Sequence, residues 1–256
     1  MVALPTSHLW VQMMRIDVAM FEQGLAISRT DAKRLICEGL VTVDGKRVDK
    51  PSYDVSESAG ITVAAVEHRY VSRGGLKLRG AIENFKIDAS GRYALDIGAS
   101  SGGFTDCLLQ SGAAHVIAID SGYGQLVSSL RFDKRVTVVE NYNARYMKRE
   151  DLEYAPDLIV MDVSFISATC IIHAIYDIAQ DGADFICLVK PQFEVGRAGI
   201  GKGGIVKEER LRKAALDKVI EFAKAVGFDY KDSCLSPIKG GDGNIEYLVH
   251  FIVRKE

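Results

Sequence analysis

Long apolar runs, paired cysteines and a large excess of one charge are all missing from this 256-residue sequence. No apolar stretch approaches the roughly 20 residues that a helix needs to cross a bilayer. The five cysteines include no C-x-x-C pair, so neither a disulfide framework nor a zinc site is expected. The formal net charge is only −2, which excludes a uniformly basic nucleic-acid-binding protein. Together these absences favour a cytoplasmic globular protein with reduced, mostly buried thiols.

The small net charge is unevenly distributed along the chain. Basic residues exceed acidic residues by two between positions 15 and 79, whereas acidic residues are in excess by four from position 80 onward. This asymmetry mildly favours an N-terminal segment that meets polyanions. Residues 1–14 are apolar but lack the basic start of a signal peptide, and we expect them to form a flexible leader.

Residues 15–66 have the pattern of a small α+β domain. Apolar residues at helical spacing predict helices over 15–25 and 28–39, and the pair Asp44-Gly45 predicts the turn of a β-hairpin. Basic side chains from the second helix and the hairpin can contact phosphates, which position an RNA without reading its sequence. The alternative is a solvated basic face. The candidate RNA-binding residues are Arg29, Lys33, Arg34, Lys46 and Arg47.

Residues 67–75 are predicted to be a linker, and residues 76–256 alternate between strands and helices. Strands separated by helical stretches imply a parallel, doubly wound sheet, an α/β fold of the Rossmann type. The predicted strands are 93–98, 115–120, 136–140, 157–162, 183–190 and 245–253, and the predicted helices include 101–111 and 208–226.

The segment DIGASSGGFTD, residues 96–106, carries the strongest local signal. It follows a predicted strand and opens a helix, where glycines let the backbone approach a ligand and free N–H groups are available. A dinucleotide fingerprint fails because position 100 is serine. A carboxylate at the end of the next strand, Asp120, suits ribose hydroxyls, and together these features favour S-adenosylmethionine over a glycine-rich turn without a ligand. The candidate cofactor-binding residues are Asp96, Gly98, Ser100, Gly102, Gly103, Phe104 and Asp120, with Asn143 for the adenine.

A second glycine-rich segment, GRAGIGKGG at 196–204, resembles a phosphate-binding loop only in part. The residue after Lys202 is glycine, so the hydroxyl that would bind magnesium is missing, and no strand immediately precedes the segment. We interpret it as a mobile lid over the site rather than an ATP-binding loop.

Four charged residues stand where a parallel sheet builds its site. Asp162 and Lys190 end consecutive predicted strands, Glu246 begins the last strand, and Lys77 lies in the first helix after the linker. A single charge at a strand end is usually a solvated loop residue. Two of them at consecutive strand ends indicate a functional site.

The motifs then resemble a known family. RIDVAMFEQGLAISRTDAKRLICEGLVTVDGKRVDKPS is similar to the alpha-L RNA-binding domain of ribosomal-protein type. VSRGGLKL, DIGASSGGFTD, MDVSF and VKPQFE resemble the hemolysin A (TlyA) family of ribosomal RNA methyltransferases, whose catalytic half is of the FtsJ type. The resemblance covers residues 15–256.

The resemblance implies a fold, an activity and a set of partners. It implies a Rossmann-like methyltransferase sheet with an antiparallel last strand, and a Lys-Asp-Lys-Glu tetrad matching Lys77, Asp162, Lys190 and Glu246. It also implies methyl transfer from S-adenosylmethionine to a ribose 2′-hydroxyl of ribosomal RNA or ribosomal subunits, without a metal and without stable membrane insertion. The oligomeric state stays open.

The chemistry assigns roles within this implied tetrad. A ribose hydroxyl is a poor nucleophile and needs a positioned group in hydrogen-bond reach. Lys190 is the candidate base, with Asp162 and Glu246 orienting the lysines and the hydroxyl. Alternatively, Lys190 only steers the hydroxyl while water takes the proton. A base-directed methyltransferase is disfavoured because Asp162-Val163-Ser164-Phe165 replaces the Asn-Pro-Pro-aromatic motif. A cytolysin and a non-catalytic RNA-binding factor are the alternatives from other classes.

Overall fold

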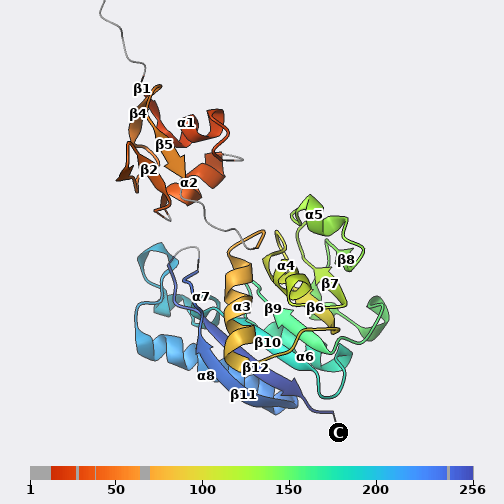
Figure 1. The fold of residues 1–256 in the computed structure, drawn as a ribbon. Coiled ribbons are helices and arrows are strands. Elements are labelled where there is room, and N and C mark those ends of the chain that lie inside the picture. The colour runs from red at the N-terminus through yellow and green to blue at the C-terminus, as the bar shows by residue number, and fades with distance from the viewer. Residues whose placement is uncertain (1–12, 27–28, 38, 64–69, 241–242, 256) are drawn as a thin grey trace, which may run out of the picture. The chain divides into compact units, whose positions relative to one another are not determined.

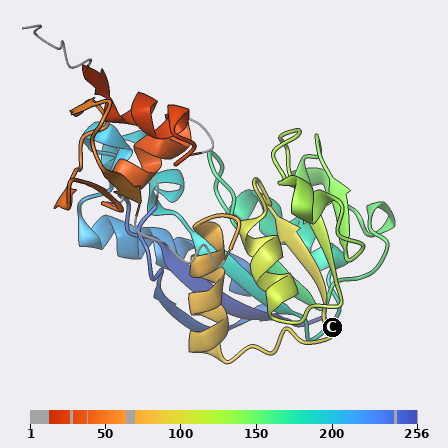
Figure 2. The ribbon, with the colours of Figure 1, turned by 45° about the horizontal axis from the view of Figure 1, so that its top comes forward.

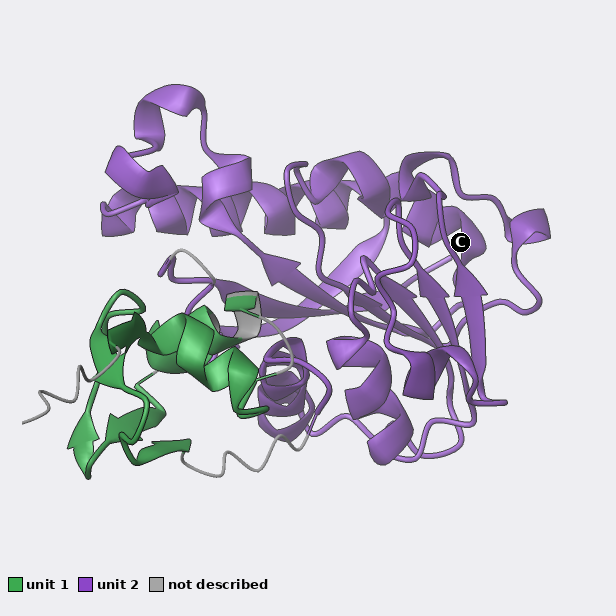
Figure 3. Ribbon diagram, turned by 90° about the horizontal axis from the view of Figure 1, so that it is seen from above, with its two compact units in different colours: residues 1–68 green, residues 69–256 purple. Residues whose placement is uncertain are grey.

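The computed structural model describes residues 13–26, 29–37, 39–63, 70–240 and 243–255. The chain divides into two compact units, Met1–His68 and Arg69–Glu256, which Figure 3 shows in different colours. The first helix of the second unit, α3 (Gly74–Phe85), includes the last two residues of the predicted linker. The predicted leader falls mostly outside the described residues, although its last two methionines belong to β1 (Met13–Arg15).

The first unit pairs two short helices with small antiparallel sheets. The helices α1 (Ile16–Glu22) and α2 (Arg29–Cys37) form where the apolar spacing predicts them (Figure 1). The predicted hairpin joins β2 (Val41–Val43) to β3 (Lys46–Arg47), and Asp44 and Gly45 both adopt positive φ in its turn. The sheet order is β3-β2-β5, and β1 pairs with β4.

Two strands of this unit, β4 (Asp54–Ser56) and β5 (Ile61–Val63), were not expected from the sequence, and neither was β1. Each is three residues long, too short to show the alternation that marks a strand.

The second unit is built on a seven-stranded sheet in the order β11-β12-β10-β9-β6-β7-β8. Five neighbouring strands, β10 to β8 in that order, are parallel, and β12 is antiparallel to both of its neighbours. The predicted doubly wound sheet with an antiparallel last strand is therefore confirmed. The strands are β6 (Tyr93–Ile97), β7 (His115–Ile119), β8 (Val136–Val139), β9 (Leu158–Met161), β10 (Asp184–Val189), β11 (Phe228–Leu235) and β12 (Tyr247–Val253).

Helices cover both faces of this sheet, as Figure 3 shows for the second unit. Alternate residues of each strand pack into two separate apolar cores, so Leu95 and Ile97 belong to one core while Ala94 belongs to the other. On one face lie α3, α4 (Gly103–Gln110) and α5 (Ser128–Arg131), with α3 and α4 side by side (Figure 2). On the other lie α6 (Thr169–Ile178) and α8 (Glu209–Val226), and the short α7 (Pro191–Glu194) contacts α8. Four 3-10 turns complete the unit at Ala144–Tyr146, Arg149–Asp151, Arg197–Gly199 and Lys202–Gly204.

The structure differs from the sequence predictions in one strand of this unit and in the burial of the thiols along the chain. The edge strand β11 was not predicted, because its residues are mostly exposed and polar and lack an alternating apolar face. The thiols are also less buried than expected: Cys107 and Cys187 are buried, but Cys37 and Cys170 are exposed at the end of α2 and in the first turn of α6.

Candidate active site

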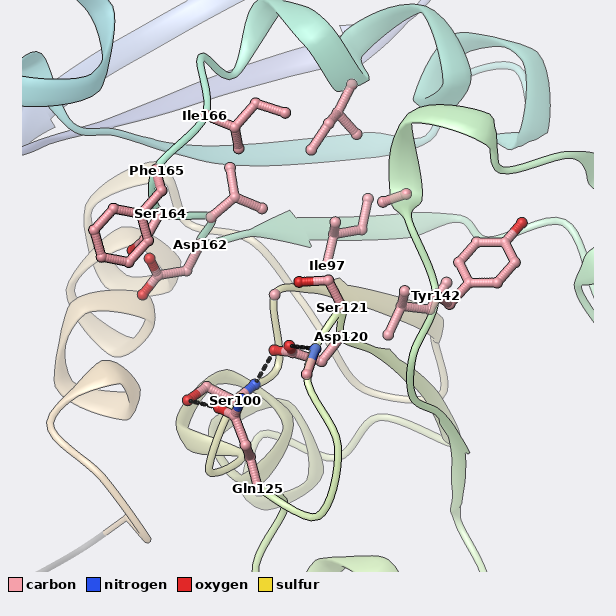
Figure 4. Close-up of a pocket in the computed structure, with 16 residues that line it drawn as sticks. Ile97, Ser100, Asp120, Ser121, Gln125, Tyr142, Asp162, Ser164, Phe165 and Ile166 are labelled. Carbon is pink, nitrogen blue, oxygen red and sulfur yellow. Dashed lines mark hydrogen bonds between the residues drawn. The ribbon is translucent and has the colours of Figure 1, made fainter.

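A cavity of about 430 Å³ opens at the carboxyl ends of β6, β7 and β9 (Figure 4). This is the edge at which parallel α/β sheets bind their ligands. Apolar walls come from Ile97, Ile119 and Ile171, and carboxylates enter from Asp120 and Asp162. The cavity therefore combines apolar surface with a few convergent polar groups, the usual make-up of a small-molecule site.

The loop after β6 forms the floor of the cavity, and two of its residues adopt positive φ where the ligand would approach. Gly98 has a φ of +86°, and a Cβ at this position would collide with the carbonyl oxygen of Asp162. Ser100 also adopts a positive φ, +48°, although it is not glycine. Such strain persists only where the surroundings enforce it, and it gathers at ligand-binding sites.

Asp120 is the group that enforces this loop conformation. One carboxylate oxygen accepts a hydrogen bond of 2.7 Å from the Ser100 N–H, and the other accepts one of 2.7 Å from the Gly122 N–H (Figure 4). A carboxylate oxygen has two lone pairs, so each oxygen can accept a further bond from a ligand hydroxyl. Asp120 therefore holds the loop and still offers two acceptors to the cavity.

The other predicted cofactor residues lie outside the cavity wall. A Cβ on Gly102 would collide with Leu130, and one on Gly103 would collide with the Ser72 hydroxyl, so these glycines permit helix packing. Phe104 is buried in the core between α3 and α4. Asn143 uses its side-chain oxygen to accept the Arg145 N–H, although both of its chain neighbours line the cavity.

Asp96 lies directly beneath the floor, because the next two residues of β6 and its loop line the cavity. The carboxyl is fully buried; Oδ2 accepts a 2.7 Å hydrogen bond from the Thr105 hydroxyl, while Oδ1 has no hydrogen-bond partner among the described groups. Burial raises the pKa of Asp96 to about 7, against the lowering effect of Thr105, and the nearby charges of Asp162 and Asp120 raise it further. An unpartnered buried acceptor of this kind suits a site built for a cationic ligand.

The raised pKa predicts how stability depends on pH. In the unfolded chain Asp96 ionises near its model value of 3.8, whereas in the folded protein it keeps its proton up to about pH 7. The free energy of unfolding therefore falls as the pH rises between 3.8 and about 7, because the unfolded chain ionises Asp96 more readily than the folded protein does. The total loss of stability is about 4 kcal/mol. Asp96→Asn should remove this loss, so chemical unfolding should show the variant gaining on the wild type between about pH 4 and 7. A stability difference that does not vary with pH would show that Asp96 is ionised throughout.

Asp162, Lys190 and Glu246 reach the same edge from three neighbouring strands. Val189 of β10 pairs with Tyr247 of β12, so Lys190 and Glu246 face each other just past the end of that ladder. Asp162 follows the last residue of β9, which is the neighbour of β10 on its other side. The strand register therefore brings three of the four predicted catalytic residues together.

The two lysines of the predicted tetrad each pair with a carboxylate. Lys190 Nζ lies 2.6 Å from Asp162 Oδ1, in a close ion pair whose angles are not those of a hydrogen bond, and it donates a 2.7 Å hydrogen bond to the Ser164 hydroxyl. Lys77 Nζ, from α3, donates a 2.6 Å bond to Glu246 Oε2, and these two side chains are only 10% and 2% exposed. An ion pair this deeply buried is costly to desolvate, so its presence is weak evidence that it stabilises the fold.

An aromatic pair beside Lys190 was missed by the sequence interpretation. Phe165 lines the cavity, is 93% exposed, and holds a positive φ of +64° (Figure 4). Its ring lies 5.3 Å from that of Phe193, which in turn lies 6.0 Å from Lys190 Nζ. The motif MDVSF contains Phe165, but nothing in the sequence shows that its ring is exposed.

The predicted lid, residues 196–204, is joined to the loop before β12 through the buried side-chain amide of Asn244. Asn244 is fully buried; its Oδ1 accepts the Val206 N–H at 3.0 Å and its Nδ2 donates to the Gly204 carbonyl at 2.9 Å. Asn244 precedes Glu246 by two residues, so the lid segment is joined to the loop that carries a member of the tetrad.

The candidate RNA-binding residues lie in the first unit. Arg29 and Lys33 are about half exposed, and Lys46 and Arg47 are exposed on β3, with the Arg47 guanidinium against Gly39. The side chain of Arg34 lies outside the described residues.

Comparison with known proteins decides the family. The FtsJ-like methyltransferase model matches residues 70–252, and the S4 domain model matches residues 14–61. This chain belongs to the FtsJ-like methyltransferase family.

Relatives of known sequence match nearly the whole chain. The 16S/23S rRNA (cytidine-2′-O)-methyltransferase TlyA of Mycobacterium tuberculosis is 45% identical over 92% of this chain and 88% of its own. Hemolysin A of Brachyspira hyodysenteriae is 42% identical over 94% of this chain and 100% of its own. A solved structure from Streptococcus thermophilus, described as a hemolysin, has a TM-score of 0.77 and 43% identity over 96% of this chain and 90% of its own.

The FtsJ-like family uses S-adenosylmethionine, and the cavity fits this cofactor. Its apolar walls suit an adenine ring, the free lone pairs of Asp120 suit ribose hydroxyls, and the Asp162 carboxylate suits the positive sulfonium. Among the described helices, none is both long and apolar enough to cross a membrane.

Cofactor affinity should depend on Asp120 more than on the loop contact beside it. Asp120→Ala removes two potential acceptors for the ribose and should weaken S-adenosylmethionine binding by about tenfold or more, measured by calorimetry. Gln125→Ala is the control, because Gln125 also holds the loop, through a 3.1 Å bond from the Ser100 hydroxyl. Equal losses in the two variants would mean that Asp120 only supports the loop.

Proposed function

We propose that this FtsJ-like methyltransferase methylates a ribose 2′-hydroxyl of ribosomal RNA in the cytoplasm, acting on ribosomal subunits or their free RNA. Two lysine–carboxylate contacts carry the proposal: Lys190–Asp162, whose carboxylate lines the cofactor cavity, and Lys77–Glu246, whose carboxylate directly precedes the neighbouring strand β12. Support for the substrate comes from the S4 domain and from the rRNA (cytidine-2′-O)-methyltransferase that is 45% identical.

S-adenosylmethionine, when bound, supplies an electrophilic methyl group on a positively charged sulfur. The task left to the protein is to bring a hydroxyl oxygen into line with that methyl group and to manage its proton. Lys190 is the residue placed for this task, because it lies between the cavity-lining residues Asp162 and Ser164.

The contacts of Lys190 favour the orienting role over the role of a base. An ammonium has three N–H donors. One is directed to Ser164 and the charge is paired with Asp162, which leaves a donor for the substrate oxygen.

The variant Lys190→Arg separates these roles. A guanidinium keeps N–H donors but does not lose its proton in proteins. If Lys190 orients the hydroxyl, Lys190→Arg should keep part of the single-turnover rate; if Lys190 acts as the base, the rate should fall as far as in Lys190→Ala.

Transfer of a tritiated methyl group from S-adenosylmethionine to ribosomal RNA tests the function itself. The phosphodiester bond next to the labelled ribose should resist alkaline cleavage, because a methylated 2′-oxygen cannot attack the adjoining phosphate. Label on a base instead of the ribose would contradict ribose methylation. RNA binding without label would indicate a non-catalytic factor.

A further inference from the structure

A buried carboxylate in the first unit gathers basic side chains around itself. Asp17, in the first turn of α1, is fully buried. Arg15 contacts it with two nitrogens, at 2.9 Å and 3.2 Å, and Arg29 donates a 3.3 Å hydrogen bond to Oδ2. Lys33 Nζ lies 3.9 Å from the same oxygen.

These three cations remain accessible although they share one carboxylate. The side chains of Arg15, Arg29 and Lys33 are 46%, 54% and 51% exposed. All three head groups lie within 4 Å of Asp17, so they must lie close to one another. The cluster has a net charge of +2, and each guanidinium keeps N–H donors that Asp17 does not use.

The carboxylate is held in its charged form. The hydrogen bond from Arg15 keeps the pKa of Asp17 below its ordinary value, against the opposing effect of burial. A buried anion of this kind needs its cations, and the cations in turn lose their freedom to move independently. Asp17 therefore holds the three positive charges in fixed positions. Without this carboxylate, the three long side chains would move independently at the surface.

We propose that Asp17 is a positioning residue for RNA binding, which preorganises Arg15, Arg29 and Lys33 as one phosphate-binding site. The proposal rests on the proposed function, because it requires an RNA substrate, and it adds Arg15 and Asp17 to the residues that serve RNA binding. Ordering long side chains before binding removes an entropic cost that the RNA contacts would otherwise have to offset. Arg15 and Arg29 offer planar sets of donors suited to phosphate oxygens.

The test is a substitution whose expected effect opposes its change in charge. Asp17→Asn removes a negative charge, so simple electrostatics predicts tighter RNA binding. If Asp17 positions the cations, the full-length variant should instead bind a fluorescently labelled mixed-sequence RNA duplex about tenfold more weakly. Asp49→Asn, at an exposed position of the same unit, makes the same change in charge and should tighten binding slightly, by at most about threefold. Binding by Asp17→Asn that is as tight as by Asp49→Asn would overturn the proposal.

A second series covers the case in which Asp17→Asn unfolds the first unit, as far-UV circular dichroism would show. Lys33 is about half exposed and lies 3.9 Å from Asp17, so Lys33→Ala leaves both arginines on the buried carboxylate and should leave the fold intact. It should reduce the slope of log affinity against log salt by about one unit, as expected for one lost phosphate contact. An unchanged slope for Lys33→Ala would contradict the proposed site.

Failure of this proposal is distinguishable from failure of the proposed function. If the wild type neither binds RNA nor transfers methyl groups to ribosomal RNA, the function is wrong. If it does both, and Asp17→Asn binds RNA as well as Asp49→Asn, only the role of Asp17 is wrong.

Discussion

Lys190→Ala should lower the single-turnover rate of methyl transfer by about 10²–10⁴-fold while leaving the fold and the cofactor affinity nearly intact. Lys190 lies just past β10 and contacts Asp162 and Ser164, which line the cavity, so we expect it to meet the substrate hydroxyl there. The cofactor contacts, by contrast, are expected from the loops after β6 and β7. Rates at saturating RNA and cofactor measure the effect, and calorimetry measures the cofactor affinity.

The control for this variant is Lys202→Ala in the second glycine-rich segment. Lys202 is exposed, and within the part of the chain that the structure describes it makes no hydrogen bond or ion pair with the tetrad. We expect a much smaller loss of rate, because a lid lysine helps the RNA settle without acting on the hydroxyl. The placement of the active site is wrong if Lys190→Ala keeps more than about a tenth of the rate, or if Lys202→Ala is the more damaged variant.

Lys77→Met should destabilise the second unit by about 3–5 kcal/mol, because it leaves the buried Glu246 carboxylate without its cation. The pair is nearly inaccessible to water, at 10% and 2% exposure. Arg79→Met, two residues further along α3, is the matched control. It breaks an exposed pair with Glu83, also at 2.6 Å, and should cost less than about 1 kcal/mol. Urea unfolding of each full-length variant measures the difference.

A double variant separates the structural part of this pair from its part in catalysis. Replacing both partners, as Lys77→Met with Glu246→Leu, removes both buried charges and should recover most of the lost stability. We expect no methyl transfer by either the single or the double variant, because the double variant regains stability without regaining the two charges of the tetrad. Recovered activity in the double variant would show that the pair serves stability alone.

The sequence was informative about the fold wherever a segment was long and strictly patterned. The parallel strands β6, β7, β9 and β10 are buried along most of their length, so each is a mainly apolar run between loops, and each begins and ends within a residue or two of the prediction. The edge strand β11 is exposed along most of its length and was missed, since its pairing with β12 depends on tertiary contacts that no local pattern records.

The site was predictable in its charged residues and much less so in its geometry. Strand-end charges indicated Asp162 and Lys190, and the family resemblance supplied Lys77 and Glu246 as partners. The motif 96–106 did not reveal that Gly103 and Phe104 serve packing between α3 and α4, because a glycine that permits helix contact looks the same in sequence as one that admits a ligand. Asp17 was read only as part of a helix, since burial among three cations is a property of the folded unit.

Mapping 2′-O-methyl groups tests most directly whether the protein methylates ribose in ribosomal RNA through the tetrad. Ribosomal RNA lacking the modification is incubated with S-adenosylmethionine and either the wild type or Lys190→Ala, and protection from alkaline cleavage is then read at every nucleotide. We expect one or a few newly protected positions with the wild type and none with the variant. No protected position with folded, cofactor-bound wild type, or the same protected positions with Lys190→Ala, would contradict ribose methylation through the tetrad.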